Sequence, residues 1–399
     1  MRAQDSGMLG GELEGNSYAI FVADRVGNVD LSTQAPIEGT YSDPDQMGLF
    51  WSMTVSKLRF HLSNRLEQLP CSPRSSVVTF TAEVAGEVVA RAELTRLFLT
   101  SEVQTKDVLE YGFVGRFFYT RQSLSSDSPI IIALSGSEGG LHTPSQFAAL
   151  FASHGYPTLA LAYFNLEHLP PEIRNIPLEY CQKAIEWIKG QPFFRSRKIA
   201  VFGRSKGAEL ALVLGATFLD IGGVIASSPT STVCIGSWSS EDAPDVYCPQ
   251  SSWSYQGKPL PFIPLTEEQC LAFQKNLIEG KRVDSIHGAC FSNQDMLEQA
   301  TIPVEKIQGP LLLISSDDDH WWPSSLHCKR MVQRLTEHDF SHSYLHLDYQ
   351  NVGHGIRFPY IPTTNLRLNG GTAKNNAFAA KDSWHHILAF LKQLSYGTV

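Results

Sequence analysis

Cysteine is scarce in this sequence, and the few cysteines form no recognisable pattern. The 399 residues contain seven, at positions 71, 181, 234, 248, 270, 290 and 328, and no two are spaced as a C-x-x-C pair. Zinc sites and disulfide frameworks need paired or regularly spaced cysteines, so we predict neither. An odd, scattered set of thiols is typical of a protein from a reducing compartment.

Long apolar segments and an excess of basic residues are also lacking. No run of 18 apolar residues occurs, so no membrane-spanning helix is predicted. The first residues lack the basic and apolar regions of a signal peptide, and the C-terminal Gly-Thr-Val is not a peroxisomal address, so we expect a cytoplasmic protein. The net charge of −8 argues against nucleic acid or an anionic membrane as the main partner, but leaves room for a local basic patch that binds a phosphorylated substrate.

The composition is that of an ordinary globular protein, with 43% hydrophobic and 18% charged residues. A chain of this length exceeds what one hydrophobic core usually supports, so we predict two domains. Within residues 1–125, apolar and polar residues alternate at 78–84 and again at 88–94, on either side of a turn at Gly86. This alternation is typical of a β-hairpin, and we predict a small N-terminal β-sandwich domain.

From residue 126 to 399 the pattern changes to strands that alternate with helices. Continuous apolar runs such as Ile130–Leu134 and Leu311–Ile314 predict parallel strands that are covered on both faces. Stretches with helical spacing, such as Leu178–Lys189, lie between such runs. We therefore predict an α/β domain with a doubly wound, mostly parallel sheet. An insertion at about 237–309, rich in Pro, Ser and aromatic residues, is a candidate lid.

A possible nucleophile motif lies between one such strand and a helix. The apolar strand 199–202 is followed by Gly-Arg-Ser-Lys-Gly at 203–207, a G-x-S-x-G sequence, and then by a helical stretch at 208–216. In this arrangement a sharp turn exposes the serine hydroxyl above the sheet, and the small residues let strand and helix pack closely. We predict that Ser205 is the nucleophile of an α/β-hydrolase domain. The alternative is a structural glycine-rich turn with an idle serine.

A serine hydroxyl needs a base to accept its proton and an acid to orient that base. In α/β-hydrolases both follow the nucleophile in the chain, with the acid first. Asp319 ends an acidic loop after the strand Leu311–Ile314, and His354 stands between two glycines after the last strand. Because the carboxyl ends of parallel strands meet at one crevice, we predict that Asp319 is the acid and His354 the base.

Several neighbouring residues are alternatives to these two. His320 is the main rival for the base and is otherwise interpreted as a substrate contact, whereas Asp317 and Asp318 are interpreted as solvated charges or helix caps. Asp319 is preferred because a proline follows four residues later, a recurrent arrangement at this loop in α/β-hydrolases. A metal site at 317–320 is not favoured, because the sequence shows no second cluster of ligands, and no cofactor is predicted.

An α/β-hydrolase also needs two backbone N–H groups where negative charge develops, the oxyanion hole. One is the N–H of Lys206, at the start of the helix that follows the nucleophile. The other is expected from the glycine-rich loop 134–140, and we choose the N–H of Ser137. This loop lacks the Lys-Ser/Thr ending of a phosphate-binding P-loop.

These motifs, in their order along nearly the whole chain, resemble the acyl-CoA thioesterase / bile acid-CoA:amino acid N-acyltransferase family. The resemblance implies an N-terminal β-sandwich on an α/β-hydrolase domain, with Ser205, Asp319 and His354 as the catalytic triad. It rests on the sequence Ser-Lys-Gly-Ala-Glu-Leu that begins at the serine, and on segments 35–41, 47–53, 161–165, 178–180, 318–320, 352–354, 359–362, 370–371 and 382–384.

The resemblance also implies a reaction. Serine members of the family hydrolyse acyl-CoA thioesters and cysteine members transfer the acyl group to amino acids, so Ser205 favours hydrolysis of a small-molecule acyl thioester. The alternatives are an esterase, lactonase or acyltransferase that acts on a specialised metabolite with the same triad, and a non-catalytic binding protein.

Two features depart from the family pattern. Members usually have some tens of residues before the point where this chain begins, so we expect the sandwich to lack its first strand or two. Glu138 stands in the oxyanion loop where relatives commonly carry glycine. A carboxylate there disfavours a developing oxyanion, so we expect the Glu138 side chain to point away from it.

Overall fold

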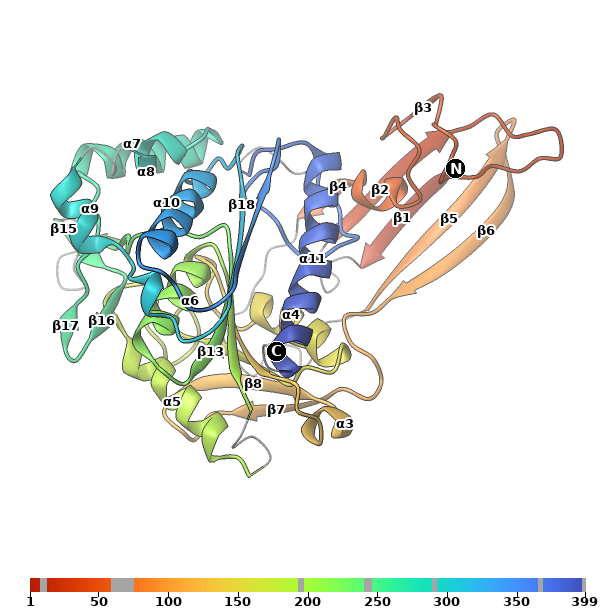
Figure 1. Ribbon diagram of the computed structural model, residues 1–399. Helices are drawn as coiled ribbons and strands as arrows, with labels where there is room; N and C mark the ends of the chain where they lie inside the picture. Colours follow the sequence, from red (N-terminus) through yellow and green to blue (C-terminus); the bar gives the residue numbers. More distant parts are fainter. Residues whose placement is uncertain are drawn as a thin grey trace.

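The computed structural model describes residues 1–7, 13–58, 75–192, 197–239, 246–288, 293–364 and 369–396. Figure 1 shows a twisted sheet flanked by helices and, beside it, a smaller sheet formed by N-terminal residues. Within these ranges no helix is long and apolar enough to span a membrane. Cys71 and Cys290, two of the seven cysteines, lie outside the described residues.

The larger sheet has eight strands, which are parallel except at the edge formed by β8 and β7. Strands β9, β10, β12 and β18 are buried along their whole length, which confirms the interpretation of the continuous apolar runs. In spatial order the strands are β19 (Tyr344–Tyr349), β18 (Leu311–Ser316), β13 (Ile221–Ser227), β12 (Ile199–Arg204), β9 (Ile130–Leu134), β10 (Thr158–Ala162), β8 (Val114–Tyr119) and β7 (Gln104–Val108).

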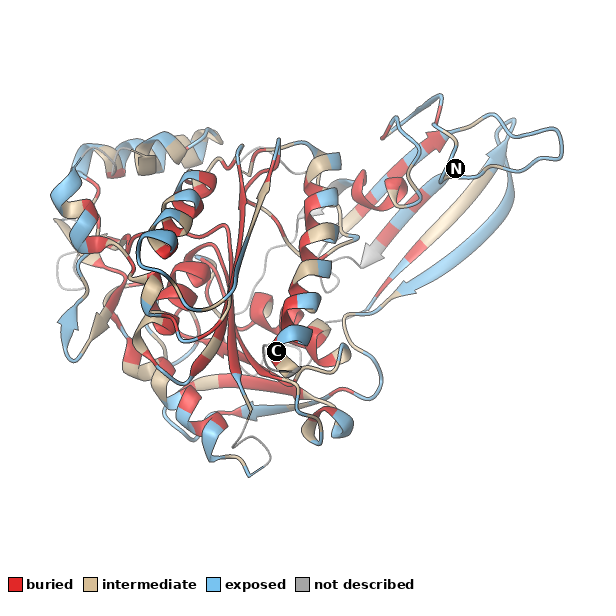
Figure 2. Ribbon diagram, viewed as in Figure 1, coloured by how far each residue is buried: buried red, intermediate tan, exposed pale blue. Residues whose placement is uncertain are grey.

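Helices cover both faces of this sheet and enclose two hydrophobic cores, seen as the continuous buried region of Figure 2. On one face α5 (Leu178–Gly190), α6 (Lys206–Thr217) and α10 (Ser324–Glu337) pack against residues such as Ile132 and Val201. On the other, α4 (His142–Ser153) and α11 (Ala373–Tyr396) pack against their neighbours Ile131 and Phe202. Successive strand residues face opposite sides of the sheet, so the neighbours Ile131 and Ile132 are buried in different cores, and so are Val201 and Phe202. This is the predicted doubly wound α/β fold.

The N-terminal residues form an antiparallel sheet in the order β3-β2-β1-β5-β6, with β4 also paired to β2. The predicted hairpin is present as β5 and β6, joined by a turn in which Ala85 and Gly86 both have positive φ. The short helix α2 packs on this sheet together with the start of α11. The elements are β1 (Arg2–Gly7), β2 (Leu13–Ile20), β3 (Glu38–Gly39), α2 (Gly48–Trp51), β4 (Thr54–Leu58), β5 (Ser76–Val84) and β6 (Glu87–Arg96).

The predicted domain boundary at residue 125 follows the short helix α3 (Arg121–Leu124). Strands β7 and β8 precede that boundary, yet they hydrogen-bond within the eight-stranded sheet. We propose that the catalytic domain includes them, so that the division of the chain lies between β6 and β7.

The segment predicted as an insertion contains short strands followed by helices. Figure 1 shows the helices α7, α8 and α9 at one end of the molecule, remote from the N-terminal sheet. The elements are β14 (Ile235–Ser239), β15 (Tyr247–Ser251), β16 (Trp253–Tyr255), β17 (Lys258–Pro259), α7 (Glu267–Glu279), α8 (Asp284–Gly288), α9 (Gln294–Ala300) and the 3₁₀ helix η3 (Val304–Lys306), and β16 also pairs with β11 (Ile176–Pro177).

Candidate active site

Ser205 occupies a strained turn between the end of β12 and the start of α6. Its backbone has φ 57° and ψ −124°, a region that residues with a side chain rarely adopt. A Cβ at Gly203 would lie 2.0 Å from the carbonyl oxygen of Gly207, and one at Gly207 would lie 2.2 Å from the carbonyl oxygen of Ser135. Backbone packs against both glycines, so the spacing of the G-x-S-x-G sequence follows from the space available at this turn.

The structure brings the side chains of Ser205, His354 and Asp319 together. The Oγ of Ser205 lies 2.8 Å from Nε2 of His354, and Nδ1 of His354 lies 2.9 and 3.0 Å from the two carboxylate oxygens of Asp319. All three are buried, with exposed fractions of 6%, 4% and 2% for serine, histidine and aspartate. An imidazole that donates from Nδ1 to the carboxylate has Nε2 free to accept the proton of the hydroxyl.

The backbone around Asp319 and His354 fixes both side chains. Oδ1 of Asp319 accepts hydrogen bonds from the backbone N–H groups of Trp321 (2.9 Å) and Trp322 (3.3 Å). The N–H of His354 donates to the carbonyl oxygen of Asn369, 2.7 Å away. A carboxylate held by two N–H donors and an imidazole has little freedom to turn, which favours one orientation of the histidine ring.

The alternative residues make other contacts. Asp317 accepts a hydrogen bond from the N–H of Asn351, and Asp318 from that of Gly371, so each holds a neighbouring loop. Nε2 of His320 lies 3.2 Å from Oδ1 of Asp318, and within the described part of the chain His320 makes no hydrogen bond to Ser205. Of the acidic run and its adjacent histidine, only Asp319 contacts His354 among the described residues.

The proposed oxyanion donors have different surroundings. Lys206 is the first residue of α6, so its N–H is one of those that have no acceptor inside the helix. In the loop after β9 it is Gly136 that approaches the serine, because a Cβ at Gly136 would lie 3.4 Å from Cβ of Ser205. Ser137 is the next residue and is exposed. Its role as the second donor stays a prediction.

The carboxylate of Glu138 lies beside Gly136, and its expected orientation away from a developing oxyanion stays a prediction. A Cβ at Gly136 would meet Oε2 of Glu138 at 2.7 Å, and the other oxygen, Oε1, lies 3.8 Å from Nη2 of Arg204. Burial acts to raise the pKa of this carboxyl, but the positive charge of Arg204, a hydrogen bond from its own backbone, the charge of Arg357 and a hydrogen bond to Thr143 together lower it. Glu138 is therefore an anion whose charge is offset by neighbouring guanidinium groups.

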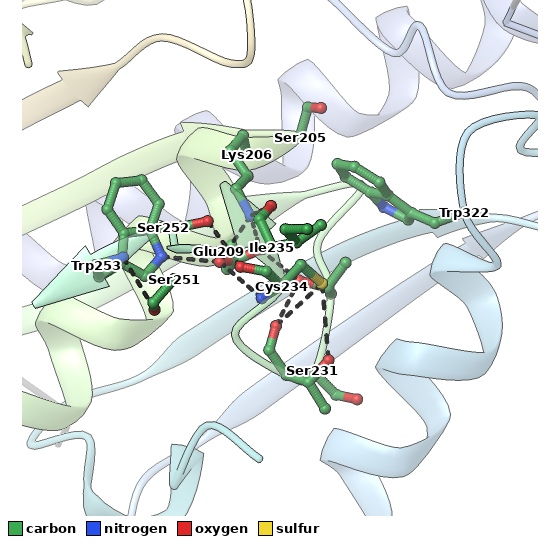
Figure 3. A network of polar contacts seen from close by, with 12 residues as sticks. Ser205, Lys206, Glu209, Ser231, Cys234, Ile235, Ser251, Ser252, Trp253 and Trp322 are labelled. Carbon is green, nitrogen blue, oxygen red and sulfur yellow. Dashed lines mark hydrogen bonds and ion pairs between the residues drawn. The ribbon is translucent and has the colours of Figure 1, made fainter. Parts of the chain in front are cut away.

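A second buried network lies on the other side of the nucleophile turn, centred on Glu209 of α6 (Figure 3). This carboxylate is fully buried and accepts hydrogen bonds from Nζ of Lys206 (2.8 and 3.0 Å), Nε1 of Trp253 (2.8 Å), Oγ1 of Thr230 (3.1 Å) and the N–H of Cys234 (3.2 Å). It thereby joins the residue after the nucleophile to the segments that lead into the insertion.

Aromatic rings of the insertion contact Trp322, which in turn contacts the histidine. The ring of Trp322 meets that of His354 edge to face at a centroid distance of 4.9 Å, and His287 of α8 meets Trp322 at 5.8 Å. Phe273 of α7 in turn contacts His287 at 5.4 Å. Burial, and then the Lys206 ammonium, lower the pKa of His287 to about 4, so this ring is neutral near pH 7. The surroundings of His354 are therefore apolar on the insertion side.

Sequence reasoning did not identify Arg204, Glu209 or Arg357 as parts of the site. Arg204 and Glu209 are charged residues within an apolar strand and helix, directly around the nucleophile, and that position was the available signal. Among the described residues, no group of three or more His, Cys, Asp or Glu is arranged to hold a metal ion.

Two models of the same protein family match this chain, one in its N-terminal part and one in its C-terminal part. Residues 176–396 match the BAAT / acyl-CoA thioester hydrolase C-terminal family, and residues 12–110 match the acyl-CoA thioester hydrolase / BAAT N-terminal region. Relatives include acyl-coenzyme A thioesterase 6 of Mus musculus, 28% identical over 96% of this chain and 87% of that protein. The peroxisomal succinyl-coenzyme A thioesterase of Mus musculus is 29% identical over 94% of this chain and 85% of that protein.

Two further similarities extend the comparison. Acyl-coenzyme A amino acid N-acyltransferase 1 of Mus musculus is 27% identical over 94% of this chain and 87% of that protein. Among solved structures, a puromycin-hydrolysing peptidase of Mycobacterium tuberculosis has a TM-score of 0.47 and 12% identity, covering 81% of this chain and 44% of that one. The C-terminal family match alone spans more than half of the residues, so this chain is a member of the BAAT / acyl-CoA thioester hydrolase family.

Proposed function

We propose that this protein is a serine hydrolase that cleaves acyl-CoA or related acyl thioesters to a free acid and a thiol. The observation that carries the proposal is the hydrogen-bonded series from Ser205 through His354 to Asp319. Relatives named as acyl-coenzyme A thioesterases support the substrate class.

In the proposed mechanism His354 accepts the proton of the Ser205 hydroxyl as Oγ attacks the thioester carbonyl carbon. The negative charge that develops on the carbonyl oxygen is stabilised by the N–H of Lys206 and by a second N–H from the loop after β9. The tetrahedral intermediate collapses, the thiolate leaves with the proton from His354, and an acyl-Ser205 ester remains. Asp319 stabilises the imidazolium that forms during each transfer.

Water completes the proposed reaction. His354 removes a proton from a water molecule, which attacks the ester carbonyl, and then returns that proton to Oγ of Ser205 as the ester bond breaks and the acid is released. An oxygen ester is less reactive toward amines than a cysteine thioester, so a serine nucleophile favours water as the acceptor. This is our reason for preferring hydrolysis to the amino acid transfer named for one relative.

The experiment is a comparison of wild type with Ser205→Ala. Intact mass after treatment with a fluorophosphonate should show one added phosphonyl group on wild type and none on the variant. Thiol release from a panel of short, long and branched acyl-CoAs should also be abolished in the variant. Simple esters are tested beside the acyl-CoAs. Labelling that persists in Ser205→Ala contradicts the assignment of the nucleophile. Ester cleavage without thioester cleavage favours an esterase.

We also propose a cytoplasmic location. The relatives include proteins named as peroxisomal and mitochondrial, so this proposal rests on the sequence of this chain and not on the family. Fractionation of cells that express the full chain without a tag at either end measures it directly.

A further inference from the structure

A cavity of 460 Å³ lies where the N-terminal sheet meets the α/β part of the fold. Segments far apart in the sequence form its walls: the end of β6, the C-terminal end of α4, the segment 358–362 and one side of α11. Figure 1 shows α11 between the two sheets. Small-molecule sites in proteins have volumes of about 300–1,000 Å³, so the cavity is large enough for a ligand.

Most of the wall is apolar. Leu150 of α4, Leu388 of α11 and Phe358 face the cavity from the α/β part of the fold. Leu94 and Leu97, at the end of β6, face it from the N-terminal part and are 47% and 63% exposed. Exposed apolar side chains that gather at one hollow indicate a binding site, whereas single exposed leucines need no explanation. We therefore expect the occupant to have an apolar body.

The basic side chains in the wall give the cavity a polar end of one kind. Arg96, His154 and His385 line it, and no Asp or Glu is among the described residues of the wall. Both histidines are exposed to solvent, so their rings are accessible to a ligand. A negatively charged group in the cavity therefore meets hydrogen-bond donors and no acidic side chain of the wall.

Arg96 is fixed in position but keeps donors for a ligand. Its Nη1 donates to Oδ2 of Asp5 at 3.2 Å, its Nη2 donates to the carbonyl oxygen of Tyr360, and its guanidinium carbon lies 5.5 Å from the centre of the Phe50 ring. These hydrogen bonds, the ones it makes within the described residues, use two of the five N–H donors of a guanidinium group. By contrast, Arg197 donates from all three of its side-chain nitrogens.

We propose that this cavity binds a monocarboxylic acid with an apolar chain. The chain lies against the leucines and Phe358, and the carboxylate accepts hydrogen bonds from Arg96 and from the two histidines. The inference goes beyond the hydrolase function, because none of Ser205, Asp319 and His354 is among the residues that line the cavity. Phe358 lies four residues after His354, so an occupied cavity also stabilises the segment that follows the proposed base.

The test is isothermal titration of the full chain with sodium decanoate and with 1-decanol, two probes of equal chain length. Decanoate should bind at least tenfold more tightly than 1-decanol. Arg96→Gln, and separately the double variant of His154→Gln with His385→Gln, should weaken decanoate binding by tenfold or more and change 1-decanol binding less than threefold. The histidine variant keeps the test valid if Arg96→Gln disturbs the fold around Asp5. Equal affinity for the two probes, unchanged in these variants, overturns the proposal.

A variant that fills the cavity places the binding there. Leu388→Trp should abolish the binding of both probes, because the larger ring occupies the space of the alkyl chain. Leu219→Trp, at a residue that is 80% exposed and outside the cavity, is the matched control and should bind decanoate as wild type does. Thermal denaturation shows that each variant is folded, and decanoate should raise the midpoint of wild type and Leu219→Trp but not that of Leu388→Trp. Undiminished binding to folded Leu388→Trp contradicts the assignment of the cavity.

A last arm separates this inference from the proposed function. Protein that a fluorophosphonate has labelled at Ser205 should bind decanoate as unlabelled protein does. If labelling abolishes the binding and Leu388→Trp does not, decanoate binds at the proposed active site as a product, which supports the hydrolase proposal and overturns the cavity site. Binding that is lost in Leu388→Trp, in a protein that cleaves no thioester and takes no label, supports the cavity site and contradicts the hydrolase proposal.

Discussion

Asp319 is the residue that we propose orients the base without taking part in the proton transfer itself. Its two oxygens accept hydrogen bonds from Nδ1 of His354 and from the N–H groups of Trp321 and Trp322. The carboxylate therefore holds the imidazole in one tautomer and one orientation. Asp317 and Asp318 are two and one residues away from Asp319, yet they hold the loops at Asn351 and Gly371. Three identical residues in a row therefore have three different environments, and in the sequence only the proline four residues after Asp319 sets that residue apart.

We expect Asp319→Asn to lower kcat by about 10³- to 10⁴-fold, because an amide that donates to His354 Nδ1 stabilises the wrong tautomer of the ring. Asp318→Asn is the matched control, since its side chain does not contact His354 and should change kcat less than threefold. Steady-state thioester hydrolysis and the rate of fluorophosphonate labelling measure both. A large loss in both variants would point to a general disturbance of the loop and contradict the assignment of Asp319.

Gly203 has no room for a side chain larger than hydrogen. Adding a methyl group there would place it 2.0 Å from the backbone of Gly207, and backbone cannot give way as a flexible side chain can. We expect Gly203→Ala to lower the free energy of unfolding by about 2 kcal/mol or more and to displace Ser205. At Gly190, in the last turn of α5, nothing lies within 4 Å of an added Cβ, so Gly190→Ala should be neutral or slightly stabilising. Thermal and urea denaturation of both variants check this contrast.

Among the elements, the insertion is connected to helix α6 through Glu209. The carboxylate contacts Lys206 on its own helix and also Thr230, Cys234 and Trp253, which flank the first strands after β13. Figure 3 shows the Lys206 side chain directed into this network and the Ser205 hydroxyl directed out of it. A shift of the insertion therefore acts on the residue that supplies the proposed oxyanion donor.

We expect Glu209→Gln to be strongly destabilising, by about 3–5 kcal/mol, because it leaves the buried ammonium of Lys206 without a counter-charge. The double variant Glu209→Gln with Lys206→Met should recover part of this loss, since it removes both charges. Asp220→Asn, which breaks the exposed pair with Lys189, is the control and should change stability by less than about 1 kcal/mol. Urea unfolding gives the values, and an absence of recovery in the double variant would contradict the charge-pair explanation.

The elements that sequence reasoning predicted well are those with a strong repeating pattern. Fully buried parallel strands such as β9 and β18 read as continuous apolar runs, and helix α5 shows one apolar stripe. Strand β7 is short and largely exposed, so no strong local pattern marks it, although it pairs within the eight-stranded sheet. Its placement depends on hydrogen bonding to β8 and thus on contacts that a local pattern does not contain.

The candidate site was predictable to the extent that its residues belong to a motif with a known chain order. Ser205 and His354 stand out because glycines flank them and strands precede them. Arg204 and Glu209 are marked only by their position around the serine, and Arg357 has no comparable signal, so their contacts emerge only when distant segments come together in the fold. Charge complementarity across distant segments is a property of the folded chain, and a single sequence does not display it.

At the scale of the whole molecule, the segment that follows His354 joins the two parts of the fold. After the histidine, Phe358 enters the core against Phe147 of α4 and Phe98, which lies between the two sheets. The chain then contacts the N-terminal part, where the side-chain hydroxyl groups of Thr363 and Thr364 donate to the carbonyl oxygens of Trp51 and Met53. The N-terminal sheet therefore supports the segment that carries the proposed base, although it contributes no group to the site in the described residues.

We therefore expect a substitution at the junction between the two parts of the fold to affect the reaction at Ser205. Phe358 is 3% exposed and borders a 460 Å³ cavity between the two parts of the fold. Phe358→Ala should enlarge that cavity, lower the free energy of unfolding by about 3–5 kcal/mol and reduce kcat, because the backbone that holds His354 loses its anchor. Phe378 of α11 is 60% exposed, so Phe378→Ala is the matched control. It should change stability by no more than about 0.5 kcal/mol and leave kcat unchanged. If Phe358→Ala loses stability but its folded fraction keeps full kcat, the N-terminal sheet stabilises the fold without positioning the histidine.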